Sequence, residues 1–265
     1  MSEYSVISPE NKEWDAYVLG QKRSHILQLS GWGDLKSEHG WQAERIGLAL
    51  EGELVAGAQI LYRPLPFRLG AMAYIPMGAY VKDAELYPRL WKAIEQRVKS
   101  RRVAFLKWEP GYFIEETALD PSQWGFEKSI QCIQPPRTIY ITLDPDDETI
   151  LARMNQGTRR KVRKGLATVQ YEFAGIERIQ AFSELMQVTG ARNDFGVHDS
   201  DYYQKVVEAF VPQQGTLIFA NHEGVCLAAI MVLYTGDTAW YMYGASSNEQ
   251  RNLMASYGIQ WQAIQ

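Results

Sequence analysis

The feature that most constrains the fold is a segment that occurs twice. Residues 51–62 and 223–234 align at an offset of 172, with glycine on glycine in the turn and tyrosine on tyrosine at the end. Residues 73–78 and 239–244 then align at an offset of 166, because the second copy is six residues shorter in a connecting hairpin. Insertions and deletions are tolerated in such connections. A strand-turn-strand-strand-helix order kept in both copies predicts tandem α+β units.

The first copy shows the full pattern of a β-β-β-α-β unit. Apolar residues at helical spacing predict a helical region at its start that ends in Ser30-Gly31-Trp32-Gly33, and alternating or continuous apolar runs predict the strands. The expected elements are a helical region at 10–40, strands at 45–50, 54–62 and 71–81, a helix at 84–99 and a strand at 103–108. In the second copy the matching helix is expected at 250–264.

The boundary between the two units is expected near Pro145, which gives domains 1–144 and 145–265. Asp144-Pro145 reads as the start of a helix, with Asp144 as the N-cap and proline in the first turn. Gly157-Thr158 is expected to break this helix, and Gly165 is expected to end the next turn in the left-handed conformation. The second unit therefore opens on two short helical turns.

Those turns carry an unusual concentration of charge. Residues 153–164 hold six basic residues and no acidic one, in a chain with a net charge of -4. Arg159 with Arg163, and Arg160 with Lys164, form two cationic rows at i,i+4, a spacing at which like charges oppose helix formation. The rows indicate either an anionic partner or a solvated helix face.

Composition limits the class of protein. An acidic balance, with a pI near 5.7, argues against general nucleic-acid binding and leaves only the local basic patch for such a role. The N-terminus lacks a basic-then-apolar leader, and the longest apolar run, residues 227–234, has the length of a strand. Two cysteines far apart and four histidines without metal-ligand spacing favour reduced thiols and no metal. We therefore expect a soluble cytoplasmic protein.

The mixed unit, with its long hairpin, third strand and helix, resembles the GNAT acyltransferase fold. In that fold the turn before the helix holds the donor pyrophosphate on backbone N–H groups. Here the second copy has Met254 where the first glycine of that loop belongs, and the first copy has Asp83 and Glu85, whose carboxylates repel a phosphate. Coenzyme A is therefore not the expected donor.

Five segments in order resemble the FemABX peptidyltransferases and together cover nearly the whole chain. They are Gln28-x-x-x-Trp32-x-x-x-Lys36 with Gly40-Trp41, Phe105-Leu-Lys-Trp-Glu109-Pro110, residues 154–165, residues 192–203, and Tyr243-Gly-Ala-Ser246 with Arg251 to Tyr257.

The resemblance implies transfer of an amino acid from aminoacyl-tRNA to the side-chain amine of the third stem-peptide residue of a peptidoglycan precursor. The precursor is either lipid-linked or nucleotide-linked (a UDP-linked muropeptide). No cofactor is implied beyond the aminoacyl-tRNA co-substrate. Such enzymes are cytoplasmic, and most work at the inner face of the membrane.

The resemblance also implies roles for single residues. Lys36, with Trp32, would contact the precursor's diphosphate. Tyr202 and Tyr243 would line the substrate channel, while aromatic residues at such positions are also common in cores. His198 stands where family members often carry arginine, and a neutral imidazole is a weaker phosphate partner.

Two further assignments follow from the same resemblance. Glu109 would take or orient a proton as a catalytic residue, or form a structural ion pair with an arginine. Arg159, Arg160, Arg163 and Lys164 would meet tRNA phosphates or anionic lipid.

Two alternatives stay open at this stage, an N-acyltransferase that uses an acyl thioester and a non-catalytic module that binds precursor or RNA.

The repeat also places the counterpart of the strand at 103–108 beyond Gln265. The second unit is therefore expected to be incomplete at its C-terminus, with an exposed sheet edge and deficient transfer.

Overall fold

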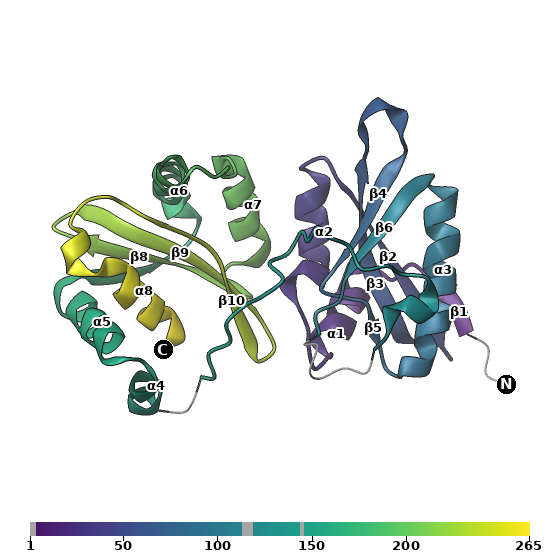
Figure 1. Cartoon of the computed structure of the whole chain (residues 1–265), viewed down its shortest axis with the longest axis horizontal. Coiled ribbons are helices and arrows are strands. Elements are labelled where there is room, and N and C mark those ends of the chain that lie inside the picture. The colour runs from purple at the N-terminus through teal and green to yellow at the C-terminus, as the bar shows by residue number, and fades with distance from the viewer. Residues whose placement is uncertain (1–3, 113–118, 144–145) are drawn as a thin grey trace. The chain divides into compact units, whose positions relative to one another are not determined.

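The computed structural model describes residues 4–112, 119–143 and 146–265 and divides the chain into two compact units, Met1–Thr138 and Ile139–Gln265. The predicted boundary at 144/145 falls in the same connecting segment, and Asp144 and Pro145 themselves lie outside the described residues. Each unit has its own sheet, as Figure 1 shows, and its own apolar core. Across the described ranges, none of the helices is both long enough and apolar enough to cross a membrane.

The first unit is built on a six-stranded mixed sheet in the order β1-β2-β3-β4-β6, with β5 paired to β3. Neighbouring strands are antiparallel, except that β4 and β6 run parallel. The chain between these two strands includes α3, and a parallel pair needs a crossover connection of this kind. The strands are β1 (Tyr4–Ile7), β2 (Gln42–Leu50), β3 (Glu53–Pro64), β4 (Ala71–Pro76), β5 (Tyr80–Val81) and β6 (Val103–Glu109).

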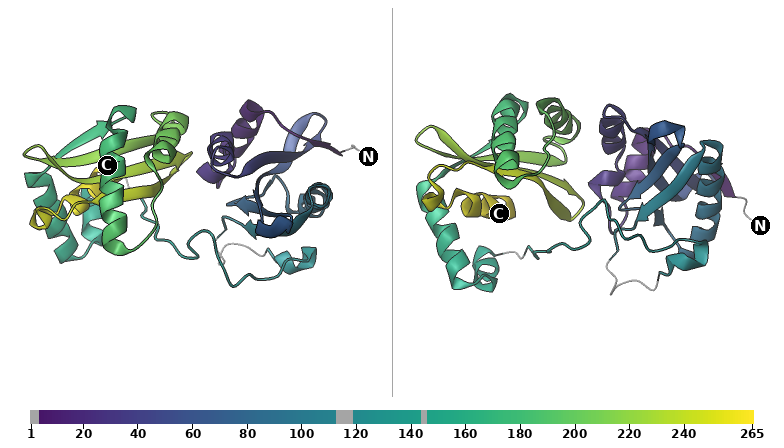
Figure 2. Two further views of the ribbon diagram at one scale, coloured as in Figure 1. Left: turned by 90° about the horizontal axis from the view of Figure 1, so that it is seen from above. Right: turned by 45° about the horizontal axis from the view of Figure 1, so that its top comes forward.

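Helices cover both faces of this sheet (Figures 1 and 2). α1 (Asn11–Leu19) and α2 (Ser30–Ser37) lie on one face, and α3 (Tyr87–Ser100) lies on the other. The α3 face holds an apolar core, in which Leu90 and Ile94 are fully buried against the strands. The short 3-10 turns are Ile26–Gln28, Pro66–Arg68, Ala84–Leu86 and Pro121–Trp124.

The second unit has an antiparallel four-stranded sheet in the order β10-β9-β8-β7. Helices α6 and α7 pack on one face, while α8, backed by α5 and α4, packs on the other. The strands are β7 (Gln170–Ala174), β8 (Gly215–His222), β9 (Val225–Thr235) and β10 (Thr238–Ser246). The helices are α4 (Asp147–Arg153), α5 (Gln156–Thr168), α6 (Ile179–Asn193), α7 (Ser200–Phe210) and α8 (Ala255–Ile264), with 3-10 turns at Ile176–Arg178 and Arg251–Leu253.

The repeat read from the sequence is a structural repeat. The β2–β3 turn has Glu51 at φ 53° and Gly52 at φ 87°, and the β8–β9 turn has Glu223 at φ 49° and Gly224 at φ 81°. Two successive positive φ angles are the geometry of the two-residue hairpin turn that matches the twist of its strands. Both units therefore contain the same hairpin within their sheets, and the predicted α+β class with tandem GNAT-like units is confirmed.

Three predicted elements of this repeat are wrong in detail. The helical region at 10–40 is two helices and a 3-10 turn, and Ser30–Gly33 begins α2 rather than ending a helix. The predicted strand at 71–81 breaks after Pro76, and Tyr80–Val81 pairs with β3 instead. The helix expected from 250 begins only at Ala255, because Gln250 and Met254 adopt the left-handed conformation at φ 44° and φ 62°.

The basic region also differs from its prediction. Asp146 is the N-cap of α4, its side chain accepting from the Thr149 N–H at 2.7 Å. The break between the helices lies at Met154-Asn155, where the Asn155 side chain caps α5, so Gly157-Thr158 is inside the first turn. An interior asparagine competes for backbone hydrogen bonds and caps a new helix better than glycine does.

Gly165 does not end a helix, because α5 continues to Thr168. A Cβ at Gly165 would lie 2.7 Å from the Met254 carbonyl oxygen and 3.0 Å from the Gly258 nitrogen of α8. The glycine is needed for close approach of the two helices and not for a left-handed stop.

Candidate functional site

In the first unit, Lys36 lies in the last turn of α2 above an aromatic ring. Its Nζ is 4.9 Å from the centre of the Trp32 ring, one turn earlier on the same helix. Burial, and then the nearby positive charge of Arg63, lower the pKa of Lys36 to about 8. A half-buried ammonium beside a second cation is unfavourable by itself and is the arrangement expected where an anion binds.

Arg63, near the end of β3, brings a second cation to the same place. Its guanidinium lies 5.3 Å from the centre of the Trp41 ring, and that ring is 6.4 Å from the ring of Tyr74 on β4. Strand pairing sets Leu61 opposite Tyr74, so Arg63 and Tyr74 share one face of the sheet. Trp41 belongs to a family-like segment of the sequence, whereas Arg63 and Tyr74 were missed because no local motif marks them.

Glu109, at the end of β6, completes this row of residues. Its Oε2 accepts from the Tyr74 hydroxyl at 2.5 Å and from the Gln134 N–H at 3.0 Å, and its Oε1 accepts from the Ile133 N–H at 2.6 Å. Burial and the bond to Glu109 raise the pKa of Tyr74 well above its usual range. Among the described residues, these hydrogen bonds, and not the predicted ion pair with arginine, hold the carboxylate. The Lys36 ammonium and the Glu109 carboxylate are thus the two ends of one row that we call the unit 1 cluster: Trp32, Lys36, Trp41, Arg63, Tyr74 and Glu109.

A buried pair of glutamines fixes the strand and the helix that carry this cluster. Gln28 donates to the carbonyl oxygens of Gln59 at 3.1 Å and Pro76 at 2.7 Å, and its Oε1 accepts from the Gln59 N–H at 2.8 Å. Gln59 in turn donates to the Leu29 carbonyl at 2.8 Å, directly before α2. Both side chains are fully buried, so this network ties the start of α2 to β3 and to the end of β4. Gln28, part of a family-like segment, therefore has a structural role.

In the second unit, the side chains of His198, Tyr202 and Tyr243 lie together. The exposed His198 ring stacks on Tyr202 with 3.6 Å between ring centres, and the Tyr202 and Tyr243 hydroxyls are 3.1 Å apart. Burial raises the pKa of Tyr202 to about 12. Tyr202 is only 1% exposed, so it is a core residue, and contact between Tyr202 and a substrate stays a prediction.

Arg192 joins two family-like segments that are far apart in the sequence, residues 192–203 and the segment that begins at Tyr243. From the end of α6 its Nη1 donates to the Ser246 carbonyl at 2.8 Å and to the Asn248 side chain at 2.9 Å, and its Nη2 donates to the Ser246 hydroxyl at 3.1 Å. Thr189, one turn earlier, accepts from the Ser246 N–H at 3.0 Å. These bonds fix the end of β10, three residues beyond Tyr243.

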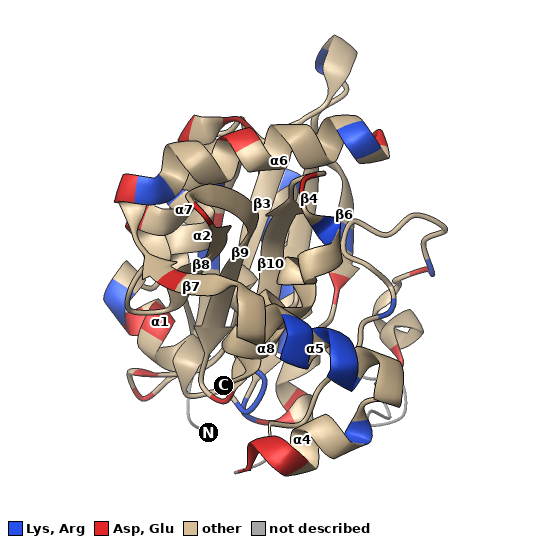
Figure 3. Cartoon of the chain, turned by 90° about the vertical axis from the view of Figure 1, so that its left-hand side faces the viewer, with Lys and Arg blue, Asp and Glu red and all other residues tan. Residues whose placement is uncertain are grey.

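The predicted basic residues of α5, a helix whose Lys and Arg positions are blue in Figure 3, separate into two groups by their contacts. Arg159 is half-buried and donates to the carbonyls of Ala152 at 3.2 Å and Met154 at 2.5 Å, which completes the end of α4. Arg160, Arg163 and Lys164 are exposed. The predicted patch thus keeps three outward cations, while Arg159 is tied to the fold.

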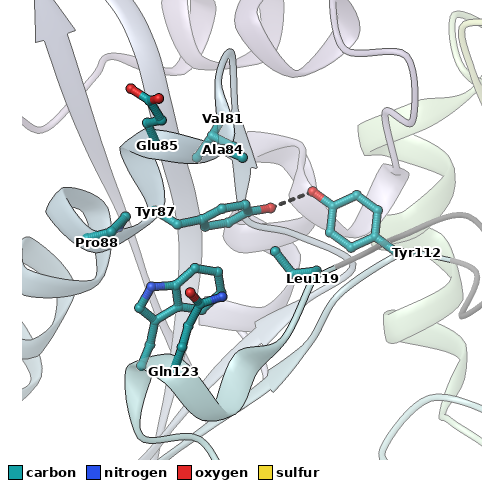
Figure 4. A pocket seen from close by; sticks show the side chains of 9 residues that line it. Val81, Ala84, Glu85, Tyr87, Pro88, Tyr112, Leu119 and Gln123 are labelled. Atoms are coloured by element: carbon teal, nitrogen blue, oxygen red, sulfur yellow. Dashed lines mark hydrogen bonds between the residues drawn. The ribbon is translucent and has the colours of Figure 1, made fainter.

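Protein groups contact the first turn of each helix that corresponds to the GNAT donor helix, and the exclusion of coenzyme A stays a prediction. In the second unit, the Met254 carbonyl lies against Gly165 of α5. In the first unit, Asp83 caps the turn before α3 through the Glu85 N–H. Beside it lies a half-open pocket of about 560 Å³ in which the Tyr87 and Tyr112 hydroxyls are 2.6 Å apart (Figure 4). Its lining includes the rings of Tyr87, Tyr112 and Trp124, and Glu85 is a charged group at its wall.

Metal-ligating side chains are scattered over the two units. Within residues 4–112, 119–143 and 146–265, histidine, cysteine, aspartate and glutamate side chains do not gather in groups of three or more that could hold an ion. The absence of a metal stays a prediction.

The sequence model of the FemAB family matches residues 10–224 and 216–265, which together span almost the whole chain. The chain belongs to the FemAB family. Its curated relatives include the lipid II:glycine glycyltransferase of Staphylococcus aureus strain MRSA252, which is 22% identical over an alignment that covers 95% of this chain and 79% of that protein. The same enzyme of strain USA300 matches with the same identity and coverage. This member of the FemAB family is therefore an aminoacyltransferase.

Solved structures agree on the fold. The crystal structure of FemX superposes with a TM-score of 0.89 at 21% identity, covering 98% of this chain and 85% of that one. A tandem GNAT protein from the clavulanic acid biosynthesis pathway superposes with a TM-score of 0.51 at 14% identity, covering 98% and 84%. The duplication of one GNAT-like unit is thus common to all three folds.

Proposed function

We propose that this FemAB member transfers an amino acid from aminoacyl-tRNA to the side-chain amine of the third stem-peptide residue of a peptidoglycan precursor, in the cytoplasm. The observation that carries the proposal is the unit 1 cluster, in which two cations, Lys36 and Arg63, are linked through Trp41 and Tyr74 to the carboxylate of Glu109. The name of the Staphylococcus aureus relatives, which act on lipid II, supports a precursor of this kind.

The two cations would bind the precursor's diphosphate. Arginine presents a planar fork and lysine a compact charge, and both form strong charge-assisted bonds with phosphate oxygens. The tryptophan rings under each cation hold it in place through cation–π contacts. An ammonium with a pKa near 8 is mostly charged at neutral pH, and an incoming diphosphate would raise that pKa and bind more tightly.

Glu109 would accept the proton that the acceptor amine loses. In the reaction, the amine nitrogen attacks the ester carbonyl of the aminoacyl-tRNA, a C–N bond forms, the ester C–O bond breaks and the tRNA hydroxyl leaves with a proton. A carboxylate has about four acceptor positions, and among the described residues Tyr74, Ile133 and Gln134 use three of those on Glu109. The fourth would accept from the amine, and Tyr74 would hold the carboxylate toward it.

The exposed cations of α5 would contact tRNA. Arg160, Arg163 and Lys164 are exposed, while Val162 and Gly165 of the same helix are buried, so the three charges are on the solvent side of the helix. Clustered cations bind nucleic-acid phosphates without reading sequence. This surface would therefore bind the aminoacyl-tRNA through its backbone.

The test is a transfer assay with a nucleotide-linked and a lipid-linked precursor and each of the twenty aminoacyl-tRNAs, with products identified by mass spectrometry. We expect one amino acid to be added to the third stem residue, and a strong decrease in the product with Glu109→Gln. Transfer from an acyl-coenzyme A and none from any aminoacyl-tRNA would contradict the proposal. Binding of precursor without turnover would favour a binding module.

A further inference from the structure

The turn between β3 and β4 carries large apolar side chains that are exposed to solvent. Phe67 is 91% exposed and Leu69 is 64% exposed, and both lie on a hairpin that extends past the helices of its own unit (Figure 1). Single exposed apolar residues are ordinary, but an aromatic and an aliphatic side chain at the tip of a projecting turn form a small apolar surface. We call residues 65–70 the tip.

Backbone hydrogen bonds hold the tip in a defined turn. The Leu65 N–H donates to the Gly70 carbonyl at 2.9 Å, and the Leu69 N–H donates to the Pro66 carbonyl at 3.2 Å. Phe67 and Arg68 both have positive φ angles, 55° and 58°, which are unfavourable for residues with a Cβ. Strained backbone of this kind that holds an apolar side chain in solvent is typical of a functional surface.

Positive charge surrounds the tip. Residues 63–72 contain two arginines and no acid, and residues 97–107 contain five basic residues and no acid. The two segments touch, because a Cβ at Gly70 would overlap the Arg102 carbonyl oxygen. Glu44 pairs with Arg97 and Arg101 and so neutralises part of this charge. Arg68 and Arg102 are exposed, beside the apolar side chains.

The tip is also next to the proposed diphosphate site. Arg63 and Met72 pair across the strands just below it, and Arg63 belongs to the unit 1 cluster. A precursor whose diphosphate lies at Lys36 and Arg63 would have its lipid chain within reach of this end of the hairpin.

We propose that the tip docks on an anionic lipid bilayer, with Phe67 and Leu69 in the interface and Arg68 and Arg102 against lipid phosphates. The inference rests on the proposed function for the identity of the lipid-linked precursor. An exposed apolar tip with Arg68 and Arg102 beside it and no acid within residues 63–72 matches a deformable anionic surface, since interfacial binding adds buried apolar area to attraction for anionic lipid. This contact would bring the unit 1 cluster to membrane-bound substrate.

The test is co-sedimentation of the full chain with vesicles of phosphatidylcholine alone and with vesicles containing about a quarter phosphatidylglycerol. We expect tighter binding to the anionic vesicles. The double variant Phe67→Ser/Leu69→Ser should bind them at least about ten-fold more weakly. Arg68→Glu should weaken binding to anionic vesicles about five-fold or more and leave binding to phosphatidylcholine unchanged. Phe173→Ser, at a phenylalanine that is 61% exposed on β7, is the matched control and should bind like the parent.

Activity assays separate this inference from the proposed function. The double variant should keep transfer to the nucleotide-linked precursor and lose transfer to precursor in vesicles. A parent that does not bind anionic vesicles, or tip variants that bind as the parent does, would overturn the docking proposal while leaving the transferase proposal standing. Loss of a parent dimer in the double variant, without vesicle binding, would instead assign the tip to self-association. Vesicle binding without transfer to either precursor would contradict the proposed function alone.

Discussion

The hydroxyl of Tyr74 donates to the Glu109 carboxylate at 2.5 Å, from a strand that runs parallel to the strand of its partner. The two residues are 35 positions apart, and Tyr74 is 3% exposed. The bond therefore fixes the direction of a carboxylate at the end of the sheet, in the same row of residues as the two cations of the unit 1 cluster.

Tyr74→Phe and Glu109→Gln test this bond from its two ends. Tyr74→Phe should lower the free energy of unfolding by about 1–3 kcal/mol, since it removes a buried bond to a charged group. Glu109→Gln should lower the transfer rate by about 10²–10⁴, the range for a general base. Thermal unfolding and single-turnover transfer measure the two effects. A Glu109→Gln variant that is less stable but transfers at the parent's rate would assign Glu109 a structural role only.

Lys36 gives a pH dependence whose sign is fixed by its lowered pKa. Burial, with Arg63, lowers the pKa to about 8 in the free protein, so the ammonium loses its proton as pH rises through this value. Precursor affinity should therefore fall above pH 8 and level off once the higher pKa of the bound state is passed. Calorimetric titration of a nucleotide-linked precursor from pH 7 to 10 measures it. Lys36→Arg should remove the dependence, because guanidinium stays charged throughout, and the same decline in that variant would remove Lys36 from the site.

The same shift predicts a gain in stability when the charge is removed. Below pH 8 the folded state holds a proton less firmly than the unfolded state, so the ammonium opposes folding there, and this cost is relieved as pH rises from 8 toward 10.5. Lys36→Met should raise the free energy of unfolding at pH 7 by about 1–3 kcal/mol while weakening precursor binding by about 1.5–3 kcal/mol. Denaturant unfolding at pH 7 and pH 10 gives the comparison. Equal or lower stability of the variant at pH 7 would show that the burial of Lys36 is compensated.

The basic face of α5 should behave as two groups. Replacing Arg160, Arg163 and Lys164 with alanine should lower tRNA affinity and reduce the slope of log K against log salt by about 0.7–0.9 for each phosphate that the protein no longer binds. Arg159→Ala should instead lower stability, because two carbonyls at the end of α4 lose their donor. Filter binding across a salt series and thermal unfolding distinguish them. A triple variant with the parent's salt slope would mean that the face is only solvated.

Gly165 and Gly258 allow a test of the packing between α5 and α8. On helix propensity alone, Gly165→Ala would stabilise α5 by roughly 0.5–1 kcal/mol, but its Cβ would be 2.7 Å from the Met254 carbonyl oxygen. We expect a net loss of about 1–3 kcal/mol from overpacking. Ala167→Gly, at an exposed position of the same helix, is the control and should lose only the propensity difference. A more stable Gly165→Ala variant would show that the helices separate without cost.

The tandem α+β units, the paired hairpins with their Glu-Gly turns, and the positions of Glu109 and Tyr243 on their strands were predictable from the sequence. Such features depend on hydrophobic period and turn residues, which are local. The predicted helix ends were less accurate, because several neighbouring residues could each cap or break a helix. Asp146 caps α4 where Asp144 was predicted, and Asn155 marks the break that was predicted at Gly157.

Which side chains lie together depends on the pairing of strands and helices that are far apart in the sequence. Arg63 and Tyr74 join Lys36 and Glu109 because β3, β4 and β6 pair in one register, and nothing local in the sequence marks either residue. Arg159 donates to two carbonyls at the end of α4 and so is not part of the exposed basic face. Gly165 allows close packing against α8, a helix about ninety residues later in the chain. Long-range packing sets these relationships, since side-chain contacts depend on distances that sequence spacing does not encode.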